Sequence, residues 1–68
     1  MILINKKKKY INLDNVHAWK IDDEDAKNIA FSFGDYEIIE DFESEREALK
    51  ALDSIRQGLL KNLLFVKL

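Results

Sequence analysis

The pattern of apolar and polar positions changes period once along this chain of 68 residues. Over residues 1–42 the apolar residues form short alternating runs, which are typical of β-strands. From Ser44 onward they recur every three or four residues, which is typical of an amphipathic α-helix. Because the chain has no proline and no repeat, we predict one domain of the α+β class. An antiparallel β-meander of four to five strands (1–42) is followed by one C-terminal helix (44–58), packed on one sheet face, and by an apolar tail (59–68).

The strongest strand signal surrounds Gly34 and Asp35 in the segment "NIAFSFGDYEIIEDF". Two alternating runs separated by such a pair predict a β-hairpin, with glycine at the position that needs a positive φ. The turn also fixes the register, because side chains on a strand alternate between the two faces. The predicted pairs on the core side are Phe33 with Tyr36, Phe31 with Ile38 and Ile29 with Glu40, and those on the outer side are Ser32 with Glu37 and Ala30 with Ile39.

The N-terminal third predicts three further strands. Residues 1–4 form a first short strand, so the lysine run 6–9 falls in the connection to the next strand, "YINL". This strand and "VHAWKI" are expected to be joined around Asp14 and Asn15, a pair that is common in turns. Because Val16 and Trp19 fall on opposite faces, we expect a bulge or a change of strand partner near Ala18.

The helix is predicted from its start signal and its apolar face. Ser44 is placed to cap the N-terminus, and Glu47 three residues later completes a capping box. Gly58 is compatible either with a left-handed residue that ends the helix or with a helix that continues through it, at a cost of about 1 kcal/mol relative to alanine. The predicted apolar face consists of Ala48, Ala51, Leu52, Ile55 and Leu59.

The tail "LLKNLLFVKL" has seven large apolar residues among its ten. Neither one helix face nor one strand face accommodates all of them, so the tail needs two surfaces to cover it. We predict either a final strand or a continued helix, packed on its own sheet and against a second copy of the chain. The predicted homodimer interface is Ile39, Leu60, Leu63, Leu64, Phe65, Val66 and Leu68.

Charge is segregated along the chain although the net charge is only −2. Residues 1–20 carry +4, residues 21–47 carry −9 and residues 48–68 carry +3. One interpretation of the basic N-terminus is a single-stranded nucleic-acid-binding protein, with lysines on phosphates and aromatic rings as stacking surfaces. Its residues would be Lys6, Lys7, Lys8, Lys9, Tyr10 and Trp19. We favour a solvated turn for the lysines. Lysines in a hairpin connection also keep a sheet edge from pairing with other chains, and the neighbouring acidic segments repel a nucleic-acid backbone.

Little in the composition supports catalysis or a cofactor. There is no cysteine and one histidine, His17, so metal sites built from these residues are excluded within one chain. The acidic run Asp22–Asp25 lacks the alternating ligands and central glycine of a calcium loop. No apolar run approaches the roughly 20 residues of a membrane span. We therefore expect a cytoplasmic, non-catalytic protein-interaction module without cofactor or metal, which forms a homodimer or binds another protein.

Three segments carry a resemblance at the level of fold. "YINLDNV", "FSFGDYEI" and "FESEREALKAL" together resemble small uncharacterised β-meander-plus-helix proteins of low-GC bacteria and phages. The order of strands and helix is also similar to the single-strand-binding coactivator-like fold, whose members dimerise and bind DNA on a curved sheet. The acidic middle of this chain departs from such a basic face. The resemblance implies a fold and brings no activity with it.

Overall fold

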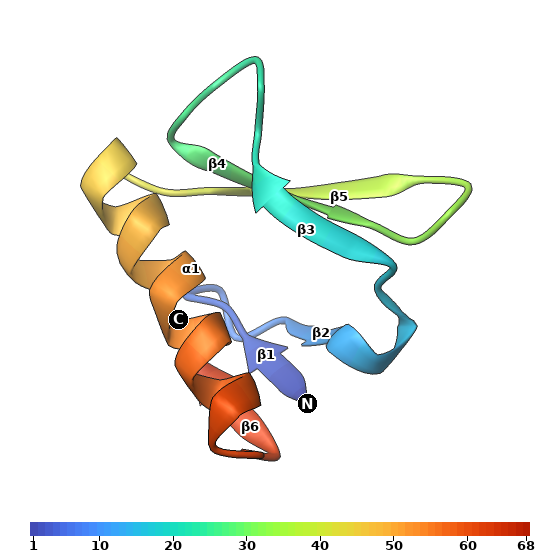
Figure 1. The fold of residues 1–68 in the computed structure, drawn as a ribbon. Helices are drawn as coiled ribbons and strands as arrows, with labels where there is room; N and C mark the ends of the chain where they lie inside the picture. Colours follow the sequence, from blue (N-terminus) through green and yellow to red (C-terminus); the bar gives the residue numbers. More distant parts are fainter.

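The computed structural model describes residues 1–68 as two small β-sheets and one α-helix (Figure 1). The strands and the helix follow one another in the predicted order, and the tail ends in a short strand, which is one of the two alternatives predicted for it. The elements are β1 (Ile2–Ile4), β2 (Tyr10–Asn12), a 3₁₀ turn (Leu13–Asn15), β3 (Ala18–Ile21), β4 (Asn28–Ser32), β5 (Glu37–Asp41), α1 (Glu45–Leu60) and β6 (Phe65–Lys67).

The α+β class is confirmed, but the strands form two sheets rather than one meander. One sheet has the order β2-β1-β6 and the other β3-β4-β5. The strands β2 and β3 do not pair, because the 3₁₀ turn diverts the chain from one sheet to the other. This turn is stabilised by Asn12, whose Oδ1 accepts a hydrogen bond from the Asp14 N–H at 3.0 Å. The two strands are joined around Asp14 and Asn15 as predicted, and the strand partner changes before Ala18. The pairing of β2 with β3 that a single meander requires is absent.

The β4–β5 hairpin has the predicted register in all its pairs, from Ser32 opposite Glu37 to Ile29 opposite Glu40. It is closed by a hydrogen bond of 2.9 Å from the Phe33 N–H to the Tyr36 carbonyl, and Gly34 has a φ of +95°. The rings of Phe33 and Tyr36 stack at 5.0 Å. Tyr36 nevertheless remains exposed, because its pair lies next to the turn, at the end of the hairpin that extends beyond the core.

Replacing Gly34 by alanine is expected to lower the free energy of unfolding by about 1–2 kcal/mol, because a Cβ is disfavoured at positive φ. The added Cβ would also lie 3.2 Å from Cε1 of His17. Urea unfolding followed by Trp19 fluorescence measures the change. Asp35→Ala is the control within the same turn, since Asp35 has no positive φ. Equal effects of the two substitutions would contradict this account of Gly34.

The helix begins as predicted and ends later. Ser44 Oγ accepts a hydrogen bond from the Glu47 N–H at 3.2 Å, whereas the Glu47 side chain makes no bond in return, so half of the predicted capping box forms. The helix continues through Gly58 to Leu60 and closes at Asn62, whose φ is +54°. The Leu63 N–H then donates to the Gly58 carbonyl at 2.9 Å, and the Asn62 N–H to that of Leu59 at 3.2 Å. These two bonds form a Schellman motif, in which asparagine replaces the expected glycine.

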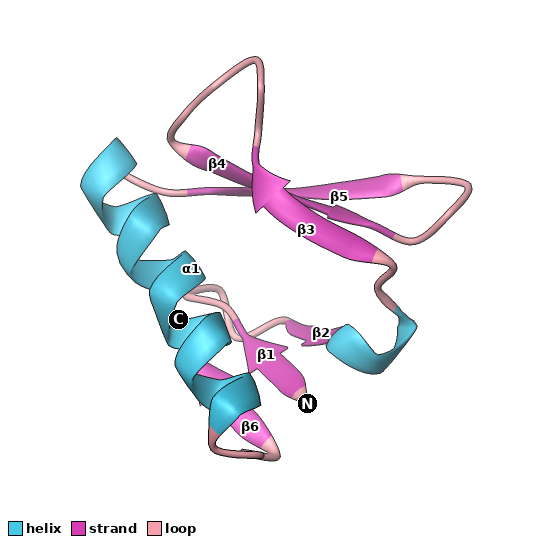
Figure 2. Cartoon of the chain, in the orientation of Figure 1, coloured by secondary structure: helices cyan, strands magenta, loops and turns pink.

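The core lies between α1 and both sheets, rather than between a helix and a single sheet face (Figure 2). The helix contributes Ala48, Ala51 and Ile55 from the predicted face, while Leu52 is half-buried and Leu59 is exposed. β6 pairs in parallel with β1, so the end of the chain completes the first sheet. The largest fully buried side chains are Leu3, Ile29, Phe31 and Ile55.

Candidate interaction surfaces

The lysine run forms the turn between β1 and β2, as predicted. Its backbone is closed by a hydrogen bond of 2.9 Å from the Lys8 N–H to the Asn5 carbonyl, and Lys8 has a φ of +61°. All four lysine side chains are exposed, and none of them forms an ion pair within the chain. The turn therefore presents four positive charges that have no ion-pair partner.

Asn5 holds this turn from beneath and joins it to the other sheet. It is the one buried polar side chain, with 8% of its surface exposed. Its Oδ1 accepts hydrogen bonds from the N–H groups of Lys7 and Lys9, both at 2.9 Å. Its Nδ2 donates to both carboxylate oxygens of Glu40 on β5, at 3.1 and 3.0 Å. Asn5 was not among the residues predicted from the sequence, although an asparagine directly after a strand and before a polar run is a recognisable turn signal.

A groove of about 320 Å³ lies between the lysine turn and β5. One wall comes from the turn and the start of β2, and the other comes from β5 and the residue after it. We call it the edge groove, since it lies along one edge strand of each sheet. It is lined by Asn5, Lys6, Lys7, Lys9, Tyr10, Ile11, Ile38, Ile39, Glu40, Asp41 and Phe42.

The residues predicted for nucleic-acid binding are only partly brought together. Lys6, Lys7, Lys9 and Tyr10 share the edge groove. Trp19 lies on β3 in the other sheet, where it is half-buried against the core and paired with Phe31. The wall that faces the lysines carries two carboxylates, those of Glu40 and Asp41. The structure thus provides no continuous basic surface on which the two aromatic rings could act together.

A second surface is formed by large apolar residues around the end of α1 and the start of β6. Leu59, Leu60, Leu63, Leu64 and Phe65 have exposed fractions of 42, 73, 46, 77 and 54%. We call these five residues the C-terminal apolar surface. Single exposed apolar side chains are ordinary on a protein surface, whereas five within seven residues are unusual.

Three residues predicted for the dimer interface have other positions. Val66 is only 8% exposed and belongs to the core, because alternate side chains of β6 face α1. Leu68 is half-buried against the same core. Ile39 is exposed, but it lies on β5 and lines the edge groove. The tail thus satisfies part of its apolar surface within the chain and leaves the rest exposed.

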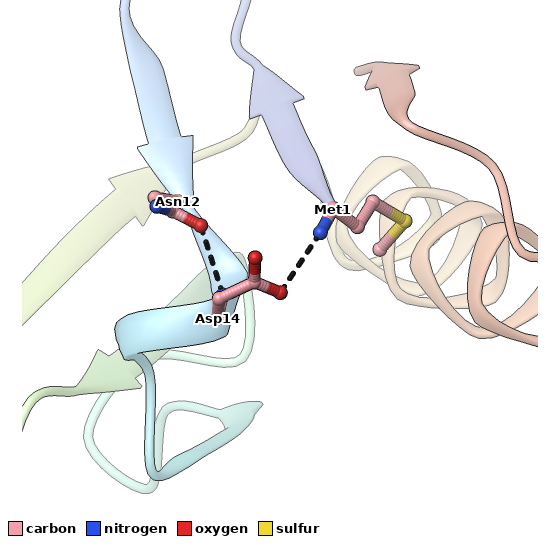
Figure 3. Close-up of polar contacts among 3 residues, drawn as sticks. All are labelled: Met1, Asn12 and Asp14. Carbon is pink, nitrogen blue, oxygen red and sulfur yellow. Dashed lines mark hydrogen bonds and ion pairs between the residues drawn. The ribbon is translucent and has the colours of Figure 1, made fainter.

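The start of the chain is fastened to the 3₁₀ turn (Figure 3). The α-amino group of Met1 lies 3.0 Å from Oδ1 of Asp14, whose own N–H is held by Asn12. The Met1 side chain points the other way, toward α1, where its sulfur packs against Gly58. Met1 thus connects the first sheet with the last helical turn.

Lys20 of β3 pairs with Asp23 in the acidic loop that follows this strand. The Lys20 ammonium donates a hydrogen bond of 2.8 Å to Asp23, and this bond, with the charge of Asp23, raises the pKa of Lys20 above its ordinary value. Both side chains are exposed, and exposed pairs add little stability. No group of three or more acidic or histidine side chains is arranged to hold a metal ion. His17 is exposed beside Gly34, and its side chain makes no hydrogen bond.

α1, with 16 residues, is the longest helix, and no helix has the length and hydrophobicity needed to cross a bilayer. Comparison with protein-family models, with curated proteins and with solved structures finds no match for the chain. The resemblance to small β-meander-plus-helix proteins therefore stays a prediction.

Proposed function

We propose that this protein is a non-catalytic interaction module that forms a homodimer through its C-terminal apolar surface. The observation that supports the proposal is the exposure of five large apolar side chains between residues 59 and 65. Fully burying one such side chain is worth roughly 1.5–3 kcal/mol. A two-fold axis brings the same patch of each copy together, so burial of each exposed side chain contributes twice to the free energy of association.

The free edge of β6 gives the dimer a defined geometry. Ile2 donates to the Leu64 carbonyl, and Leu68 donates to the Ile4 carbonyl, so even-numbered residues of the tail bond to β1. The backbone groups of Phe65 and Lys67 then face away from the sheet. Antiparallel pairing of two β6 strands about Val66 would place Phe65 of one copy opposite Lys67 of the other. No like charges would face each other in this arrangement.

Light scattering after size exclusion tests the dimer across about a hundredfold range of protein concentration. We expect a mass near twice the 8.0 kDa of one chain. Leu60→Glu with Leu64→Glu should give a monomer with unchanged circular dichroism, because both side chains are exposed.

Leu49→Glu is the matched control, since Leu49 is a similarly exposed leucine of α1 outside the C-terminal apolar surface. This variant should keep the dimeric mass. A mass of one chain for the unmodified protein at every concentration would refute the proposed dimer. A dimer lost equally in the control would move the interface elsewhere on α1.

A further inference from the structure

The edge groove places the free edges of two sheets beside each other. β2 is an outer strand of the sheet β2-β1-β6, and β5 is an outer strand of the sheet β3-β4-β5. Both strands line the same groove of about 320 Å³. Unpaired edges are the positions at which an extended chain can add to a sheet. The direction of their free backbone groups decides whether these edges can accept one.

On β5 the free groups belong to residues that line the groove. The Phe42 N–H donates to the Lys27 carbonyl at 3.0 Å, which makes this a hydrogen-bonded pair of the antiparallel ladder. Hydrogen-bonded pairs alternate with non-bonded pairs along such a ladder, so Glu40, two residues before Phe42, also has its backbone groups directed to β4. The N–H and C=O groups of Ile39 and Asp41 therefore point to the open edge. Both residues line the edge groove.

On β2 the same alternation leaves the backbone groups of Tyr10 without a partner in β1. The Asn5 N–H donates to the Lys9 carbonyl, and the Leu13 N–H donates to that of Met1, both at 2.9 Å. Odd-numbered residues of β2 thus bond to β1, and the backbone groups of Tyr10 and Asn12 point outward. β2 is only three residues long, whereas β5 has five. The longer edge is the better one for an added strand.

The charges of the edge groove select the kind of segment. Lys6, Lys7 and Lys9 line it and make no ion pair. Of the two carboxylates opposite, that of Glu40 already accepts two hydrogen bonds from Asn5. Three lysines against the two carboxylates of Glu40 and Asp41 leave the lining of the groove with one net positive charge, located on the turn. Tyr10 and Ile39 supply exposed apolar surface. An acidic segment with apolar residues at alternate positions matches both features.

We propose that the edge groove binds an acidic extended segment of another protein, which adds as a strand to β5 and places its carboxylates on the lysine turn. The backbone groups of Ile39 and Asp41 form the ladder, and Lys6, Lys7 and Lys9 provide the charge selectivity. The proposal is independent of the C-terminal apolar surface, which lies at the end of α1 and on β6.

The probe is a capped peptide of alternating glutamate and valine, added to the isotope-labelled protein and followed by amide NMR. We expect saturable chemical-shift changes at the amides of Ile39 and Asp41, and slower hydrogen exchange at both. The dissociation constant should be about 100 μM and should rise with salt concentration. A peptide of alternating lysine and valine is the charge control and should bind at least tenfold more weakly. Methylation of the peptide amides that would donate to β5 should abolish binding.

Two variants of the protein separate the backbone from the charge contribution. Ile39→Pro removes an N–H that makes no bond to β4, so the hairpin should remain and peptide affinity should fall at least tenfold. Glu37→Pro changes an equivalent edge position outside the groove and is its control. Replacing Lys6, Lys7 and Lys9 by glutamine should weaken binding and flatten its salt dependence.

Four results would overturn the proposal: no shift of the groove amides by the acidic peptide, equal binding of the lysine peptide, retained binding of the methylated peptide, or retained binding by Ile39→Pro. Shifts of the same amides with protein concentration alone would assign the edge to a second copy instead. If Ile39→Pro does not fold, the methylated peptide decides the role of the backbone on the unmodified protein.

Discussion

Replacing Gly58 by alanine is expected to lower the free energy of unfolding by about 2 kcal/mol, although alanine favours a helix interior over glycine by about 1 kcal/mol. The reason is the close approach of two elements to the last turns of α1. A Cβ on Gly58 would lie 2.5 Å from Cγ2 of Val66 and 2.9 Å from the sulfur of Met1. Met1 can adopt another rotamer, but Val66 is β-branched, buried and fixed in β6.

Chemical unfolding of Gly58→Ala, Val66→Ala and the double variant isolates this contact. Val66→Ala alone should cost about 2 kcal/mol through the cavity it leaves. In the double variant the added methyl group enters that cavity, so the two costs should not add. Ser54→Ala, at an exposed position of the same helix, should change stability by less than about 0.5 kcal/mol. A stabilising effect of Gly58→Ala would show that β6 does not pack on this turn.

The position of Gly58 in the fold could be predicted only in part from the sequence. Both a helix end and a continuous helix were compatible with the local sequence, because propensity alone differs by about 1 kcal/mol. The choice depends on β6, which pairs with β1 at the opposite end of the chain. The glycine is therefore explained by a long-range contact that no local pattern reports.

The same distinction applies to the two sheets. The β4–β5 hairpin was predicted pair by pair, since a two-residue turn fixes the register of its strands. The division into two sheets was missed, because it depends on the 3₁₀ turn at Leu13–Asn15 and on the parallel pairing of β6. In a strand of three residues such as β6, the apolar pattern is too short to predict the strand with which it pairs.

Of the candidate surfaces, the lysine turn and most of the apolar tail were identified from sequence, whereas the edge groove was not. The turn lies between two strands whose pairing is local, so its position follows from the sequence. The groove depends on the position of β5 relative to the turn. That position is held by the hydrogen bonds from Asn5 to Glu40, which join residues 35 apart in the chain.

Replacing Asn5 by aspartate is expected to lower the free energy of unfolding by about 2 kcal/mol, because a second carboxylate would then face Glu40 at hydrogen-bond distance. The introduced carboxylate could still accept hydrogen bonds from the N–H groups of Lys7 and Lys9, so the lysine turn keeps its acceptor. The contact between the turn and β5 is the one that is weakened, because a hydrogen-bond donor to Glu40 has been replaced by a second negative charge.

Adding Glu40→Gln to the Asn5→Asp variant restores the hydrogen bond with its direction reversed. The amide at position 40 then donates to the carboxylate at position 5. Unfolding free energies of the two single variants and the double variant should therefore show the double variant recovering at least half of the loss. Lys7→Gln, which changes only an exposed side chain of the turn, should leave stability unchanged. A double variant no more stable than Asn5→Asp would mean that Asn5 serves the turn alone. Recovery would show instead that one buried amide holds the two walls of the edge groove together.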